Sequence, residues 1–119
     1  MQIAIHTRGF SLTEGLRNHV HNRLGFTLSR GASRVRRVEV KLSDVNGPRG
    51  GVDKRCLIEI RLDGLPVIVV QDVQSDMYTA IDRAATRAAR TVMRRLALSN
   101  YRRRRPGVLP TELYGTGNL

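Results

Sequence analysis

The spacing of apolar residues changes twice along the chain, and this change constrains the fold more than any other feature. One stripe recurs every four residues, as on the buried face of a helix: Leu16, Val20, Leu24 and Leu28. Between residues 34 and 73 apolar and polar residues mostly alternate, which is typical of half-buried strands. A second helical stripe follows: Tyr78, Ile81, Ala85, Ala88, Val92 and Leu96.

These patterns predict an ordered series of elements. Strands are expected over four segments: 2–6, 34–42, 56–62 and 67–73. Ser11 or Thr13 can cap the first helix, and Ser75–Asp76 can cap the last, which should run to about Leu98. The expected fold is therefore α+β with the order β-α-β-β-β-α, in which a four-stranded sheet carries two helices packed on one face.

The length of 119 residues allows one domain, which we expect to span residues 1–98. Residues 99–119 hold an arginine run and several Gly, Pro and Thr residues without periodicity, so a basic, disordered C-terminal tail is predicted there. The Gly-rich segment 44–54 should form a flexible hairpin loop.

Charge indicates the kind of partner. Lys and Arg number 21 against 10 Asp and Glu, a formal net charge of +11, and such a charge favours a polyanion. An alternative is that the arginines reflect codon usage, because the chain is also rich in Gly, Ala and Val.

The arrangement of the arginines favours the first interpretation. Four of them recur at spacings of four, three and four, which confines them to an arc of about 60° on a helix: Arg83, Arg87, Arg90 and Arg94. We call these four residues the arginine row. Like charges at such spacings cost free energy, and a planar guanidinium matches phosphate oxygens. A phosphate backbone explains the row, although a merely solvated Arg-rich face remains an alternative.

Other cations could extend the row. Arg17, Arg23 and Arg30 belong to the first helical region, and Lys41 is a weaker candidate on the outer face of a strand. Charged residues on an open sheet face often serve only solubility.

Catalytic groupings are poor. His19 and His21 diverge on a helix, His6 stands alone on its strand, and Cys56 should be inert packing. We therefore expect no enzyme activity, no metal or other cofactor, and no small-molecule substrate. A single cysteine and the lack of a long apolar segment favour a cytoplasmic protein without a membrane partner.

Three segments resemble one known family. They are Met1–Ile3, Leu12–Arg17 and the stretch Ser75–Asp82 (SDMYTAID), which the arginine row follows. They are similar to the ribosome hibernation-promoting factor and ribosome-associated inhibitor A family, also described as sigma-54 modulation proteins. The likeness covers about residues 1–97 and corresponds to a short form of the family.

The resemblance implies a fold like that of double-stranded-RNA-binding domains. It also implies a factor that is monomeric off the ribosome, binds 16S rRNA in the decoding channel of the small ribosomal subunit, and blocks mRNA and tRNA under stress or in stationary phase. By motif it assigns rRNA contacts to Arg17, Arg23, Arg87, Arg90 and Arg94. The prediction that Arg83 contacts rRNA rests only on its place in the arginine row.

Two other functions stay open from the sequence. One is a generic double-stranded-RNA-binding protein, which would hold free duplexes as tightly as ribosomal subunits. The other is a protein-interaction transcription modulator, whose charge would serve an acidic protein partner.

Overall fold

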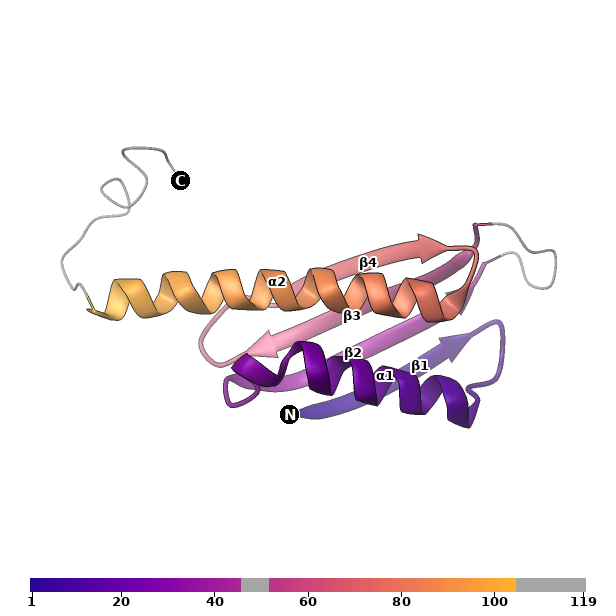
Figure 1. The fold of residues 1–119 in the computed structure, drawn as a ribbon, viewed down its shortest axis with the longest axis horizontal. Helices are drawn as coiled ribbons and strands as arrows, with labels where there is room; N and C mark the ends of the chain where they lie inside the picture. Colours follow the sequence, from indigo (N-terminus) through magenta and orange to yellow (C-terminus); the bar gives the residue numbers. More distant parts are fainter. Residues whose placement is uncertain (46–51, 105–119) are drawn as a thin grey trace.

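The computed structural model describes residues 1–45 and 52–104 of the chain. Its elements follow in this order (Figure 1): β1 Gln2–Arg8, α1 Glu14–Thr27, a short 3-10 helix η1 Ser29–Gly31, β2 Val35–Asp44, β3 Lys54–Leu62, β4 Ile68–Gln74 and α2 Met77–Arg104. The expected order β-α-β-β-β-α is confirmed.

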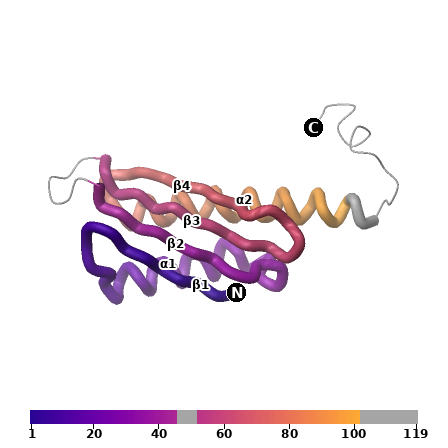
Figure 2. The backbone as a smooth tube through the Cα atoms, turned by 180° about the vertical axis from the view of Figure 1, so that it is seen from behind, coloured from indigo at the N-terminus to yellow at the C-terminus, as the bar shows by residue number. Residues whose placement is uncertain are grey.

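The four strands form one sheet in the order β1-β2-β3-β4. β1 runs parallel to β2, and the remaining neighbours pair antiparallel. Both helices cover the same face of this sheet, so that in Figure 2 the strands lie in front and the helices behind. The opposite face, which we call the open face, has no helix over it within the described part of the chain.

The core lies between the sheet and the two helices. Alternate residues of a strand point to the same side, so Val38, Val40 and Leu42 face the helices and are almost fully buried. Cys56, Ile58 and Ile60 do the same on β3, as predicted: each is at most 1% exposed. The predicted stripe is also buried, from Leu16 on α1 to Leu28, which directly follows this helix.

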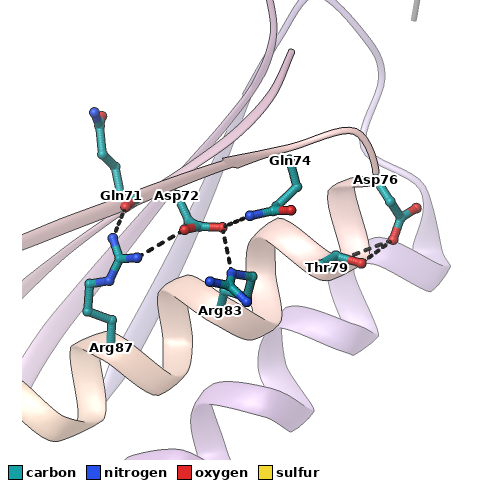
Figure 3. Close-up of polar contacts among 7 residues, drawn as sticks. All are labelled: Gln71, Asp72, Gln74, Asp76, Thr79, Arg83 and Arg87. Atoms are coloured by element: carbon teal, nitrogen blue, oxygen red, sulfur yellow. Dashed lines mark hydrogen bonds and ion pairs between the residues drawn. The ribbon is translucent and has the colours of Figure 1, made fainter. Parts of the chain in front are cut away.

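Both helices begin at capping side chains. Of the two residues considered for α1, Thr13 is the cap, and its Oγ1 accepts a hydrogen bond from the Leu16 backbone N at 3.1 Å. Asp76 precedes α2, and its Oδ2 accepts from the backbone N and Oγ1 of Thr79, both at 3.0 Å (Figure 3). These bonds satisfy amide groups that a helix start leaves without partners.

Two details of the predicted last helix were wrong. It does not end near Leu98 but continues to Arg104, because the residues in between include no Gly or Pro and Arg is a good helix former. Tyr78 is not part of the buried stripe: it is 41% exposed, and its ring meets His19 edge-on at 4.9 Å. Met77, Ala80 and Ala84 are buried instead.

Parts of two predicted segments lie outside the described residues, namely 46–51 of the Gly-rich loop and 105–119 of the tail. The two sides of that loop are joined at its base, where Lys54 Nζ lies 3.2 Å from Asp44 Oδ1 and 2.9 Å from Asp53 Oδ1. In residues 1–45 and 52–104, no helix combines the length and the apolar character that crossing a membrane requires.

Candidate nucleic-acid interface

The arginine row lies on the side of α2 that faces away from the core. All four of its side chains are exposed, whereas Ala84, Ala88 and Val92 between them pack against the sheet. The separation follows from the helical period, since the row and the buried residues occupy different arcs of the same helix. Four guanidinium groups are therefore presented along one line.

Part of this row contacts an acid that sequence reasoning missed. Asp72 Oδ1 on β4 lies 3.1 Å from Arg87 Nη2, and its Oδ2 lies 3.5 Å from Arg83 Nε (Figure 3). Gln74 Nε2 donates a third contact to Oδ2 at 2.8 Å. The Asp72 side chain is only 8% exposed, while the two guanidinium groups remain more than half exposed.

A signal for Asp72 existed in the sequence. Asp72 points to the same side of β4 as Ile68 and Val70, which is the side that faces the helices. An apolar residue is expected at such a position. A carboxylate at such a position needs a cationic partner, and α2 is the next element along the chain. Alternation of β4 could therefore have predicted the pairing.

The other flank of the row meets α1. A hollow between the two helices is lined by residues of both: Arg23, Asp82, Arg83, Thr86, Arg87 and Arg90. Asp82 Oδ1 lies 2.6 Å from His19 Nε2 and 3.5 Å from Arg23 Nε. This ion pair places Arg23, a residue of α1, beside the row on α2.

Arg30 joins the same surface further along. It lies in η1 and lines a second hollow together with Arg90. The structure therefore gathers six of the eight predicted binding residues, which we call the arginine surface: Arg23, Arg30, Arg83, Arg87, Arg90 and Arg94. Only Asp72 and Asp82 pair with them among the described residues, so the surface keeps a net charge of about four positive units at neutral pH.

Arg17 and Lys41 do not belong to this surface. Arg17 is six residues before Arg23, which places it about 120° away around α1, and it lines neither hollow. Lys41 lies on the open face, where its Nζ is 3.7 Å from Glu59 Oε2. Contact of these two residues with RNA stays a prediction.

The described residues offer little for catalysis. Burial raises the pKa of the Cys56 thiol to about 12, with a smaller contribution from the nearby Asp72 carboxylate, so Cys56 is a poor nucleophile at neutral pH. No group of three or more His, Cys, Asp or Glu side chains in the described ranges is placed to hold a metal ion. The arrangement is suited to binding an anionic surface by charge and shape.

Two solved structures share the fold of this chain. A ribosomal subunit interface protein from Coxiella burnetii superposes with a TM-score of 0.71 at 16% identity, covering 82% of this chain and 99% of that one. The N-terminal domain of Protein Y from Thermus thermophilus gives 0.66 at 26% identity, with 79% and 98% covered. A search of curated protein sequences found no match. The model of the sigma 54 modulation protein / S30EA ribosomal protein family matches residues 3–97, and the chain belongs to this family.

Proposed function

We propose that the protein is a ribosome-associated hibernation factor that inhibits translation. In this proposal the arginine surface binds 16S rRNA in the decoding channel of the small subunit, and the bound protein blocks mRNA and tRNA under stress or in stationary phase. Off the ribosome the protein is a monomer. Support comes from membership of the S30EA ribosomal protein family and from likeness to a protein described as a ribosomal subunit interface protein.

The observation that carries the proposal is the concentration of cations on one side of the molecule. The arginine surface crosses from α1 through η1 to α2, and three of its members, Arg30, Arg90 and Arg94, make no ion pair with any described residue. Guanidinium groups in such an array can each contact a backbone phosphate and release the counterions condensed on it. Occupancy alone then silences the subunit, and no bond is made or broken.

The test compares two double variants that remove equal charge. Arg90→Ala/Arg94→Ala changes the arginine surface, and Arg55→Ala/Arg61→Ala changes the open face. Co-sedimentation with small subunits across a salt series gives the affinity and its salt dependence. The first variant should bind more weakly and lower the slope of log K against log salt by about 1.4 to 1.8, at about 0.7 to 0.9 per lost phosphate contact.

The open-face variant should bind as the wild type does. Equal loss in both variants would mean that net charge, and not this surface, drives binding, and unchanged binding of Arg90→Ala/Arg94→Ala would refute the assignment. A competing RNA duplex separates this function from generic duplex binding, because only a generic binder is displaced from subunits by equimolar duplex. Association that survives nuclease treatment would instead indicate a protein partner.

A further inference from the structure

Phe26 is the most exposed large apolar side chain in the described part of the protein. It lies in the last turn of α1 and is 75% exposed. The apolar residues beside it in the sequence behave differently, since Leu24 and Leu28 are fully buried. A single exposed apolar residue needs no explanation, so the argument depends on the surroundings of Phe26.

Those surroundings form a groove that apolar and cationic residues line together. Phe26 and Thr27 line it from α1, and Ala89 and Met93 line it from α2. The remaining lining residues are Ser29, Arg30, Thr86 and Arg90. No Asp or Glu lines this groove, although Asp82 lines the neighbouring hollow.

The groove is continuous with the arginine surface. Thr86 and Arg90 line both this groove and the hollow that holds Arg23. A ligand that extends along the arginine surface would therefore meet an exposed aromatic ring and two arginines, Arg30 and Arg90, in one groove. This combination is what sites for unpaired nucleotides use, where a base stacks on an aromatic ring and cations hold the adjoining phosphates.

We propose that one unpaired nucleobase of the bound RNA stacks on Phe26, and that Arg30 and Arg90 hold the phosphates on its two sides. The proposal rests on the proposed function, because it assigns one contact within the rRNA interface. An apolar peptide would gain nothing from a rim of two arginines, and a basic segment would be repelled by it. Phenylalanine carries no hydrogen-bonding group, so the stacking contact itself does not select among the four bases.

The nucleobase site would also favour RNA with unpaired nucleotides over a perfect duplex, which the arginine row cannot do. Phosphates are present in every duplex, but bases in a duplex are stacked on each other and cannot reach Phe26. An RNA with an unpaired nucleotide at the correct position therefore gains a contact that a perfect duplex lacks. This would favour folded ribosomal RNA over duplex of equal charge.

The first experiment measures affinity for small subunits with Phe26→Ala, with Phe26→Tyr as the conservative variant. Because Phe26 is largely exposed, its removal leaves the core intact. Loss of one stacked base should weaken binding about 5- to 150-fold, and the slope against salt should stay unchanged because no phosphate contact is lost. Phe26→Tyr should bind small subunits about as tightly as the wild type, because tyrosine keeps an aromatic ring at this position.

The second experiment uses the absence of tryptophan from the sequence. Phe26→Trp places a single tryptophan in the groove. Stacking on a base should quench its emission when an adenylate hexamer is added, or when small subunits are added and the emission of subunits alone is subtracted. Val69→Trp is the matched control, because Val69 is 56% exposed on β4 and faces the open side of the sheet. Its emission should not change.

The outcomes separate this inference from the proposed function. If the wild type fails to bind subunits, the proposed function is wrong. If Phe26→Ala binds as tightly as the wild type while Arg90→Ala/Arg94→Ala does not, only the nucleobase site is wrong. Weaker binding of Phe26→Ala, together with a blue shift and no quenching of the tryptophan, would show a protein in the groove and overturn the assignment to a base.

Discussion

Replacing Asp72 with Asn should change stability and RNA affinity in opposite directions. Asp72 is almost buried and accepts from Arg87 and Gln74, while Arg83 lies within ion-pair distance. The substitution keeps the shape of the side chain and removes its charge. One oxygen becomes an NH₂ group, which is a donor where the carboxylate accepted.

The expected loss of stability is modest. A hydrogen bond to a charged group contributes about 1.5 to 3 kcal/mol, and the exposure of both guanidinium groups reduces this value. We expect a loss of about 1 to 2 kcal/mol in the free energy of unfolding, which corresponds to a melting temperature lower by about 5 to 10 °C for a domain of this size.

The expected gain in affinity has a separate cause. Without the carboxylate, Arg83 and Arg87 together make about one more effective phosphate contact. The salt slope should then steepen by about 0.7 to 0.9, which at 0.1 M salt is roughly a five- to eightfold increase in affinity.

Thermal denaturation and subunit co-sedimentation across a salt series measure the two effects on the same preparation. Arg83 and Arg87 remain present in this variant, so any change in binding reports how Asp72 affects them. A fall in affinity at a temperature where the variant is fully folded would refute the charge argument. It would mean that Asp72 holds the two arginines in the geometry that RNA requires.

Two further predictions concern single groups. Arg37 and His6 hold the pKa of Glu39 below its usual value of 4.5, so this carboxylate stabilises the fold above that pH and the effect is lost as the pH falls through its folded pKa. Urea denaturation of Glu39→Gln between about pH 5 and pH 3 should therefore show a smaller decline in stability than the wild type, and equal declines would contradict this. Cys56, buried and with a pKa of about 12, should react with a thiol reagent at pH 8 only after unfolding. Rapid labelling of the folded protein would contradict it.

Much of the fold followed from local patterns. The β-α-β-β-β-α order could be predicted because strands and helices bury apolar residues with different periods. The burial of Val40 or Leu24 follows from the spacing of the apolar residues close to it in the sequence. The end of α2 was harder to predict. Ser99 and Asn100 are weak signals to stop a helix, and the intrinsic preferences of the following arginines favour its continuation.

Sequence alone determined that Arg83, Arg87, Arg90 and Arg94 share one exposed line, because the helical period converts spacing directly into direction. Only the tertiary structure decided which other cations join them. Arg23 and Arg30 reach the row because α1 and η1 pack beside α2, and Lys41 is separated from it by the thickness of the sheet. The same packing brings Asp72 to two of the arginines and Phe26 to the groove. These contacts join residues distant in the chain, and such pairs depend on how elements dock and not on the period of any one element.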